Sequence, residues 1–487
     1  MHQVLEPAFV GRTYGDFLFR PQVGVVDSRR AVSLTTRLSR RLRLELPVVS
    51  ANMDSVTGAR MAEAMALEGG MGFVHRGLPI AVQAEAVQRV KRRHGYVVEQ
   101  PLCLPRGTTI REARVFIATH NITGMLIEDA RGSGRLAGLL SNRDLPWVEG
   151  REEHPVEQFM TPAARLVTGP PGIPMEEAER RMFEHRIEKL PLVDAEGRIR
   201  GLITKKDVIL ARRRPYSSRD AKGHLLVGAA IGARGDFLER AAELLRVGAD
   251  ALLIDIAHGH SHAMREAVEA VRAKFGDVEL VCGNVATAEG AAFLKELSAD
   301  AVKVGVGPGR GCRTRLETGA GVPQLQAVRE AWCAVGETVP IIADGGVRDD
   351  KDVFLALICG ASSVMLGSLL SGTDEAPGSV IEDPGTGEKR KIYRGMASPQ
   401  AVLDALYSAE PREDALAVDV PAEGQEMQVP YRGSVVDILS RIRGHLRSAV
   451  SYAGEATLAA ARTKVLPDPL RYLVPLSSAA RDESYER

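Results

Sequence analysis

Short apolar runs alternate with longer amphipathic stretches along the second half of the chain. From Leu225 onward the runs are LLVGAAIG, ADALLIDIAHG, VELVCGNV, DAVKVGVGPG, VPIIADGG and SSVMLGSLL, and segments typical of helices separate them. The apolar residues within each run are nearly continuous, which indicates parallel strands that are buried on both faces. This half of the chain therefore predicts six strands, each paired with a helix.

Two further units of the same type lie near the start of the chain. LPVVSANMD at 46–54 and GGMGFVHRG at 69–77 are apolar runs, and a helix is predicted between them over 58–68. Eight such units predict a (β/α)8 barrel. Polar residues and glycines follow the predicted strand ends, as expected where one face of a barrel carries the active site. These residues are Asn52, Asp54, Asp255, Asn284, Gly307, Asp344 and Gly367.

The alternation of apolar runs and helical segments changes between the second and third predicted strands. Residues 101–145 and 165–210 are two copies of one pattern, in which an apolar strand, a turn, a helix and a second strand lead to Gly-Leu-Leu or Gly-Leu-Ile and then to an aspartate. A repeated unit inside a barrel indicates an inserted domain. We expect a barrel formed by residues 1–94 and 215–487 and an insert over 95–214, with halves at about 95–150 and 155–214.

Charge and composition exclude several classes of protein. Lys plus Arg and Asp plus Glu both number 63, so no overall charge favours nucleic acid or an anionic membrane. No run approaches about 20 apolar residues, and the first residues lack the pattern of a signal peptide. The five cysteines form no CxxC pair, so neither a disulfide framework nor a zinc site is indicated. We expect a cytoplasmic enzyme.

A glycine-rich loop with one cysteine follows the fourth run of the second half. The sequence VKVGVGPGRGCRTRLETGAGVPQ at 302–324 places Cys312 after closely spaced glycines. Glycines allow a ligand to approach the backbone, and a thiol on such a loop suits covalent attack once it is activated. The alternative is a cysteine that serves only as a small buried side chain. Arg310 stands where a dinucleotide fingerprint requires its last glycine, which argues against a Rossmann loop.

Motifs along nearly the whole chain resemble those of the IMP dehydrogenase and GMP reductase family. They are SANMDSVTG at 50–58, IDIAHGHS at 254–261, GNVAT at 283–287, the cysteine loop, ADGG at 343–346 and YRGM at 393–396. The repeated insert resembles a tandem CBS (Bateman) module. The resemblance implies that Cys312 attacks C2 of a purine, with Thr314 in the proton-transfer machinery. The positions that match nucleotide-binding residues are Ser50, Asn284, Gly309, Arg310, Asp344, Gly346, Gly367, Ser368, Tyr393, Gly395 and Met396.

The same resemblance implies further ligands. Asp255 and Asn284 match positions beside the nicotinamide cofactor, and backbone carbonyls of Gly307, Gly309 and Cys312 match a site for a monovalent cation such as K⁺. In the insert, Asp144, Thr204, Lys206 and Asp207 match positions where CBS modules bind ATP or GTP. A purely structural insert is the alternative. The family also implies a homotetramer, which the insert can pair into octamers.

One departure lies in the cysteine loop itself. The family usually has a serine that touches phosphate where this chain has Arg310. Arginine can bind phosphate through two hydrogen bonds, but it is much bulkier than serine. The geometry of this loop is therefore expected to differ from that of its relatives.

In this family, oxidation of IMP and reduction of GMP share the covalent intermediate. Residues outside the cysteine loop distinguish the two reactions. Dehydrogenases of the family use an Arg-Tyr pair to activate water after YRGM, whereas residues 397–433 contain Tyr407 and Arg412 but no such pair. Reductases use the loop threonine with a glutamate, and Glu382 matches that position if the next turn is lengthened. A solvated loop charge is the alternative for Glu382.

Other residues point both ways. The stretches Ala51-Asn52-Met53-Asp54, Thr318-Gly319 and Ser451 to Gly454 look like those of reductases, whereas IDIAHGHS, YRGM and a CBS pair are found in dehydrogenases. The favoured hypothesis is NADPH-dependent reductive deamination of GMP to IMP, in purine salvage. The alternatives are oxidation of IMP to XMP with NAD, and a weakly catalytic sensor of purine nucleotides.

Overall fold

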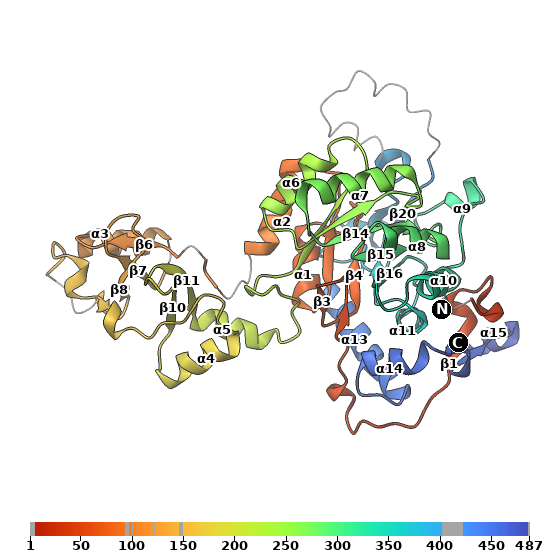
Figure 1. Cartoon of the computed structure of the whole chain (residues 1–487), viewed down its shortest axis with the longest axis horizontal. Coiled ribbons are helices and arrows are strands. Elements are labelled where there is room, and N and C mark those ends of the chain that lie inside the picture. Colours follow the sequence, from red (N-terminus) through yellow and green to blue (C-terminus); the bar gives the residue numbers. More distant parts are fainter. Residues whose placement is uncertain are drawn as a thin grey trace, which may run out of the picture. The chain divides into compact units, whose positions relative to one another are not determined.

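The computed structural model describes residues 5–92, 97–99, 101–120, 122–145, 150–401 and 422–485. The chain divides into two compact units (Figure 1). One contains Met1–Arg93, Tyr216–Ser218 and Leu225–Arg487, and the other contains His94–Pro215 and Arg219–His224. In the described ranges, no helix is long and apolar enough to cross a membrane.

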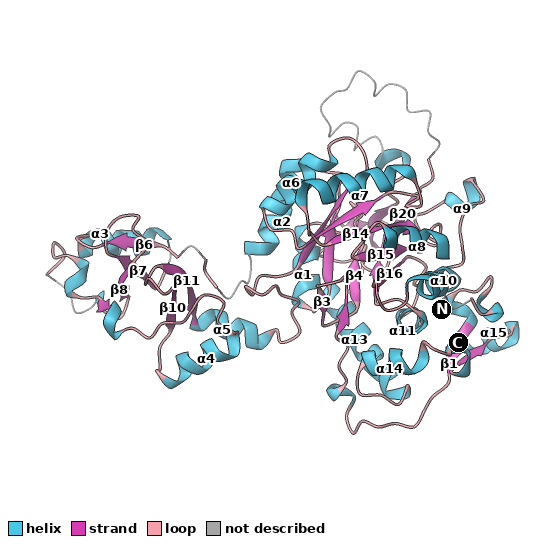
Figure 2. Ribbon diagram, in the orientation of Figure 1, coloured by secondary structure: helices cyan, strands magenta, loops and turns pink. Residues whose placement is uncertain are grey.

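The first unit is built on a closed parallel barrel, drawn as magenta arrows in Figure 2. The strand order is β12-β13-β14-β15-β16-β17-β4-β5, and β5 pairs with β12 to close the ring. This confirms the predicted (β/α)8 barrel and all eight predicted strands. The strands are β4 Val48–Ser50, β5 Met71–Val74, β12 Val227–Ile231, β13 Ala251–Asp255, β14 Leu280–Val285, β15 Ala301–Val304, β16 Ile341–Asp344 and β17 Ser363–Leu366.

Helices cover the outside of the barrel. They are α1 Ala59–Leu67, α2 Ile80–Arg92, α6 Phe237–Arg246, α7 His262–Phe275, α8 Ala288–Glu296, α10 Gln324–Val335, α11 Asp350–Cys359 and α13 Val435–Tyr452. Helix α7 shows how the sequence defines such an element. The Ser261 hydroxyl accepts a hydrogen bond from the Met264 amide at its start, and Gly276 ends it with a φ of 64°.

Burial explains why the strand runs are continuously apolar. Every residue of β12 and β17 is buried, because the barrel interior lies on one side and the helices lie on the other. Gly228 of β12 leaves room for the ring of Phe73, which a β-carbon at that position would contact closely. The barrel core therefore depends on small and large residues facing each other across neighbouring strands.

Shorter elements complete the first unit. A three-stranded antiparallel sheet extends from the chain after β17. The sheet strands are β18 Ile381–Glu382, β19 Lys389–Arg394 and β20 Glu426–Pro430. The remaining elements are β1 Phe17–Phe19, β2 Thr36–Arg37, β3 Arg43–Leu44, β21 Leu473–Pro475, α9 Thr314–Glu317, α14 Leu458–Val465, α15 Ser478–Tyr485 and the 3-10 turns Pro7–Phe9, Tyr14–Asp16, Arg29–Ala31 and Pro469–Arg471.

The second unit contains both copies of the repeated pattern. Its elements are β6 Cys103–Pro105, α3 Ile110–His120, β7 Gly124–Glu128, β8 Leu136–Ser141, β9 Thr161–Pro162, α4 Met175–Glu184, β10 Lys189–Val193, β11 Ile199–Thr204, α5 Lys205–Arg213 and the turns Val156–Gln158 and Ala163–Arg165. The second copy differs from the expectation at its start. Its leading segment makes a single bridge, Gly169 to Leu192, where the first copy has strand β6. Identification of this unit as a CBS module stays a prediction.

Candidate functional site

The polar residues predicted at the strand ends meet at one end of the barrel. Parallel strands bring their carboxyl ends to the same rim, so residues distant in sequence become neighbours. Asn52 donates a hydrogen bond to Asp255 at 2.9 Å, and Asn284 donates to Asp344 at 2.9 Å. This rim is the candidate active site, and three features occupy it: the cysteine loop, a relay of side chains, and a buried lysine.

The cysteine loop needs its glycines for close packing. Gly305 has a φ of 152°, and a β-carbon there would collide with the Asp344 carbonyl oxygen. A β-carbon at Gly311 would lie 3.0 Å from the Gly395 amide nitrogen. The loop closes through a hydrogen bond from the Cys312 amide to the Gly309 carbonyl at 3.0 Å. Any larger residue at these glycines would displace the loop that carries the thiol.

A chain of hydrogen bonds starts at the Cys312 thiol. The thiol donates to the Thr314 hydroxyl over an Sγ–Oγ1 distance of 3.2 Å. The Thr314 hydroxyl in turn donates to Oε2 of Glu423 at 2.7 Å. All three side chains are partly buried. The Glu423 carboxylate, at the end of this series of hydrogen bonds, can accept a proton. The relay can therefore convert the thiol into the nucleophilic thiolate.

Backbone pairing holds Glu423 in place. The segment that precedes β20 runs antiparallel to the cysteine loop, with a bridge between Cys312 and Gly424. The Arg313 amide donates to the Glu423 carbonyl at 2.7 Å, and the Gln425 amide donates to the Gly311 carbonyl at 3.0 Å. The position of Glu423 beside Thr314 is therefore fixed by its own main chain.

The prediction that Glu382 lies beside Thr314 is wrong, because Glu423 occupies that place. Glu382 is in the outer strand β18, with 60% of its side chain exposed and its carboxylate 3.9 Å from Lys389. A two-residue edge strand cannot bury this carboxylate at the rim. Sequence reasoning missed Glu423, although Glu423-Gly424-Gln425 directly before the strand-like run EMQVP was an available signal.

A buried lysine connects two of the predicted site residues. Lys303 of β15 has 3% of its side chain exposed, and its ammonium lies 2.8 Å from Asp255 and 2.6 Å from Asp344. Burial alone would raise the pKa of Asp255, but Lys303 and the amide of Asn52 lower it overall. Asp255 is therefore ionised at neutral pH.

Asn284 leaves one acceptor open at the rim. Its amide group donates to the Gly305 carbonyl at 2.7 Å as well as to Asp344. Its side-chain oxygen is buried and has no hydrogen-bond partner among the described residues. Such an orphaned oxygen suits a donor on a bound nucleotide or cofactor. The residues present therefore fit a dinucleotide or nucleotide ligand.

Tyr393 lies beside the glycine turn that follows β17. A β-carbon at Gly367 would lie 3.1 Å from the Tyr393 hydroxyl, and that hydroxyl donates to the Met53 sulfur at 3.8 Å. Burial, then the nearby Asp344 carboxylate, raises the pKa of Tyr393 to about 12. The phenol therefore stays protonated and can donate to an anion.

The other predicted nucleotide residues are spread around this rim. Ser50 is fully buried, and its hydroxyl accepts a hydrogen bond from Thr57 at 2.9 Å, which leaves its own proton to donate. The Met396 sulfur accepts from the Asp54 amide at 3.3 Å. The Ser368 carbonyl accepts from the Ser371 hydroxyl at 3.1 Å. A β-carbon at Gly346 would meet Gln324, and one at Gly395 would meet the Gly311 carbonyl.

Arg310 has an exposed side chain. Its carbonyl accepts a hydrogen bond from the Gln425 amide group at 2.9 Å, so the backbone is held while the guanidinium is free to reach an anion. Of the carbonyls predicted to bind a cation, that of Gly309 already accepts the Cys312 amide, and Gly307 adopts a φ of 85°. The cation site stays a prediction.

In the second unit, the two predicted nucleotide-binding aspartates play matching local roles. Asp144 accepts from the Ser141 amide at 2.7 Å and from its hydroxyl at 2.8 Å. Asp207 accepts from the amide and hydroxyl of Thr204 at 3.0 and 2.6 Å. Lys206, next to Asp207, is exposed. Tyr407 and Arg412, which the sequence singled out, lie outside the described residues.

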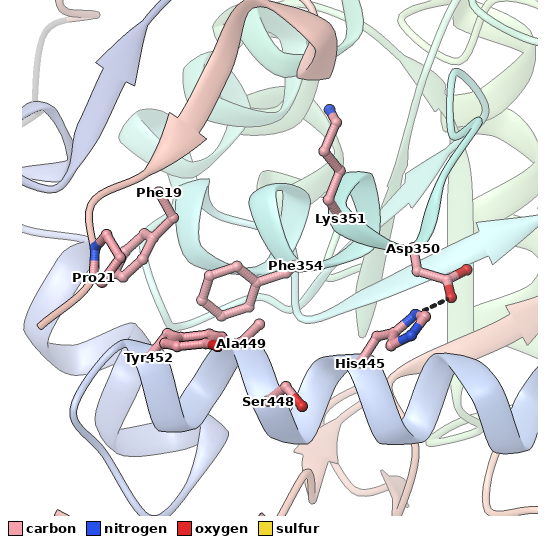
Figure 3. A pocket seen from close by; sticks show the side chains of 9 residues that line it. All are labelled: Phe19, Pro21, Asp350, Lys351, Phe354, His445, Ser448, Ala449 and Tyr452. Carbon is pink, nitrogen blue, oxygen red and sulfur yellow. Dashed lines mark hydrogen bonds and ion pairs between the residues drawn. The ribbon is translucent and has the colours of Figure 1, made fainter. Parts of the chain in front are cut away.

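A separate cavity of about 350 Å³ lies between the β1 segment and helices α11 and α13 (Figure 3). Its lining is mainly apolar, with Phe19, Phe354 and Tyr452 around the hollow. The His445 ring and Asp350 are joined by a 2.6 Å hydrogen bond at one end of it. None of the residues of the relay or of the lysine network lines this cavity.

Known proteins resemble this chain over nearly its full length. Residues 11–485 match the IMP dehydrogenase / GMP reductase domain family. Inosine-5'-monophosphate dehydrogenase of Aquifex aeolicus is 45% identical, covering 91% of this chain and 90% of the relative. The corresponding enzyme of Nitrosopumilus maritimus is also 45% identical, covering 92% and 93%.

Solved structures of GMP reductases, from the same family, also resemble this chain. A GMP reductase from Trypanosoma brucei, a cysteine-to-alanine variant in complex with guanosine 5'-monophosphate, has a TM-score of 0.78 and 37% identity, covering 98% of this chain and 97% of that one. The T. brucei enzyme with guanosine 5'-triphosphate has a TM-score of 0.69 and 34% identity, covering 96% and 98%. The chain therefore belongs to the IMP dehydrogenase / GMP reductase family and is an oxidoreductase that acts on a purine nucleotide.

Proposed function

We propose that the protein is a GMP reductase, which converts GMP, NADPH and two protons into IMP, NADP⁺ and ammonium. The observation that carries the proposal is the relay from Cys312 through Thr314 to Glu423. It places a proton acceptor and donor beside the sulfur, where the purine amino group must leave. The T. brucei GMP reductase with GMP, which is similar over nearly the whole chain, supports the same substrate.

The relay accounts for the first half of the reaction. Glu423 takes the thiol proton through Thr314, and the Cys312 thiolate forms a bond to C2 of the purine. The exocyclic amine then leaves C2 as ammonia, taking a proton that Glu423 returns through Thr314. The same two groups thus act first as base and then as acid.

NADPH supplies the hydride that C2 needs when the carbon–sulfur bond breaks. Asp255 and the free oxygen of Asn284 are the groups that fit this cofactor at the rim. On the substrate side, Asp344 accepts from the ribose hydroxyls, while Tyr393 donates to the phosphate near Gly367 and Ser368. The exposed guanidinium of Arg310 gives the phosphate a second, charged partner.

The dehydrogenase reaction requires hydrolysis of the covalent adduct, and this step needs a group that activates water. The dehydrogenases that the sequence resembles use an Arg-Tyr pair after YRGM, and residues 397–433 contain no such pair. A second candidate function is nonetheless oxidation of IMP to XMP with NAD. It is favoured by the two dehydrogenases that are 45% identical to the chain.

We also propose that the inserted unit is a CBS module that binds ATP or GTP through Asp144, Thr204, Lys206 and Asp207. The T. brucei GMP reductase solved with GTP supports a purine triphosphate as a ligand of such a chain. Asp144 and Asp207 each accept a hydrogen bond from the amide of the residue three positions earlier, and this matching geometry supports two equivalent half-sites. A cytoplasmic homotetramer or homo-octamer, with K⁺ at the cysteine loop, completes the proposal.

Two parallel assays test the proposed reaction. The purified full chain is incubated with GMP and NADPH, and separately with IMP and NAD, while the nicotinamide absorbance is followed. We expect NADPH oxidation with GMP only. XMP formation from IMP with no turnover of GMP would assign the dehydrogenase reaction instead, and no turnover in either assay would favour the nucleotide sensor.

A further inference from the structure

Lys303 is a charged residue in a strand that is otherwise apolar. It is the third residue of β15, whose four residues are all buried. Burial alone would lower the pKa of this ammonium, but Asp255 and Asp344 raise it well above its usual value. Lys303 is therefore a permanent cation between the carboxyl ends of β13 and β16. A buried charge of this kind is kept only where its partners compensate it.

The lysine touches both halves of the proposed site. Asp255 lies on the cofactor side, and Asp344 lies on the side of the purine nucleotide. One ammonium contacts both carboxylates, at 2.8 and 2.6 Å. The two carboxylates carry two negative charges and share one positive charge. Any change in how strongly one of them holds the lysine changes the charge that balances the other.

The hydrogen bonds leave one carboxylate oxygen open to a ligand. Both oxygens of Asp255 are engaged, Oδ1 by Lys303 and Oδ2 by Asn52. On Asp344, Lys303 and Asn284 both bind Oδ2, so Oδ1 has no hydrogen-bond donor among the described residues. The Asp344 side chain is 21% exposed. A ribose hydroxyl can therefore reach Oδ1, while the lysine fixes the rest of the carboxylate.

We propose that Lys303 is a positioning residue that couples the purine nucleotide at Asp344 to the nicotinamide dinucleotide at Asp255. The inference rests on the proposed function for the assignment of these two sides. If Asp255 is neutralised, the full charge of Lys303 falls on Asp344. This makes Asp344 a weaker acceptor for the ribose. The converse change at Asp344 weakens Asp255 for the same reason, because the full charge of Lys303 then falls on Asp255.

Binding measurements on the full chain test the coupling without turnover. GMP alone and NADPH alone are titrated calorimetrically into the wild type, Asp255→Asn, Lys303→Met and the double variant. We expect Asp255→Asn to weaken GMP binding about fivefold when Lys303 is present. In the Lys303→Met background the same change should alter GMP affinity by less than about twofold.

A second buried lysine provides a matched control. Lys391 of β19 donates to the carbonyls of Thr373 and Ala376 at 2.9 and 2.6 Å and contacts neither aspartate. In a Lys391→Met background, Asp255→Asn should still weaken GMP binding about fivefold. Loss of the effect in both backgrounds would attribute the coupling to general loosening and overturn the proposal.

A reciprocal measurement keeps the test valid if Lys303→Met fails to fold. Asp344→Asn, with Lys303 intact, should weaken NADPH binding about fivefold, although Asp344 lies on the nucleotide side. Unchanged NADPH affinity in Asp344→Asn together with unchanged GMP affinity in Asp255→Asn would refute the coupling.

The same titrations with IMP and NAD separate this inference from the proposed reaction. Coupling with IMP and NAD in a chain that does not turn over GMP would keep the role of Lys303 and reject the reductase. Coupling with neither pair of ligands, in a chain that reduces GMP, would reject the role of Lys303 alone.

Discussion

Replacing Glu423 with glutamine tests the relay most sharply. Glu423→Gln keeps the shape of the side chain but removes the carboxylate that accepts the Thr314 proton at 2.7 Å. Since a positioned acid–base group contributes about 10²- to 10⁴-fold, we expect kcat with GMP to fall by about 10²- to 10³-fold. At about 1.4 kcal/mol per tenfold change, this corresponds to about 3 to 4 kcal/mol of transition-state stabilisation.

The binding of GMP should change little, because Glu423 acts on the reacting atoms, and the backbone hydrogen bonds from Arg313 to Glu423 and from Gln425 to Gly311 remain. We expect a dissociation constant within about threefold of the wild-type value. The assay is NADPH oxidation at saturating GMP, with GMP affinity measured separately by calorimetry.

Glu382→Gln is the matched control. It removes the same charge from an exposed strand of the same region, and kcat should stay within about twofold because exposed charges contribute little. A large loss of kcat in Glu382→Gln with a normal rate in Glu423→Gln would refute the assignment of the relay.

Four further predictions follow from the site and the insert. Cys312→Ala should abolish turnover while retaining GMP binding by calorimetry, and residual steady-state turnover would contradict covalent catalysis. Tyr393→Phe should raise KM for GMP about tenfold, since it removes a donor to an anion, and the effect should be constant from pH 6 to pH 9 because the pKa of Tyr393 is about 12. Burial lowers the pKa of His75 to about 4. Because the unfolded chain binds this proton up to about pH 6.5, the free energy of unfolding should rise by up to about 3 kcal/mol between these values and stay level above them. Denaturation of His75→Gln at both pH values should show a smaller rise, and an identical rise would count against the assignment. Lys206→Ala should remove the effect of GTP on turnover without changing the basal rate, and an undiminished GTP response would exclude Lys206 from the nucleotide site.

The barrel could be predicted from the sequence because its strands are buried on both faces. That burial produces continuous apolar runs such as those at β12 and β17, and the polar residues that follow them necessarily meet at one rim. The apolar runs and the polar residues that follow them were sufficient to predict that Asp255, Asn284 and Asp344 lie at this rim. The repeated insert was equally visible, because a duplicated pattern does not depend on long-range packing.

The relay could not be predicted in full, because its last member comes from a distant segment. Glu423 is 109 residues from Thr314, and it reaches it through an antiparallel pairing with the cysteine loop. Local pattern does not show which segment pairs with the cysteine loop, and the family resemblance predicts Glu382, before β19, in this role instead. Lys303 was also overlooked, although a lysine within an apolar run is a signal that a buried partner of opposite charge exists.

Ammonia release measures the proposed reaction most directly. With GMP and NADPH as the only substrates, we predict one ammonia and one IMP for each NADPH oxidised, and neither product in Cys312→Ala. Formation of XMP from IMP and NAD, with no ammonia released from GMP, would contradict the account.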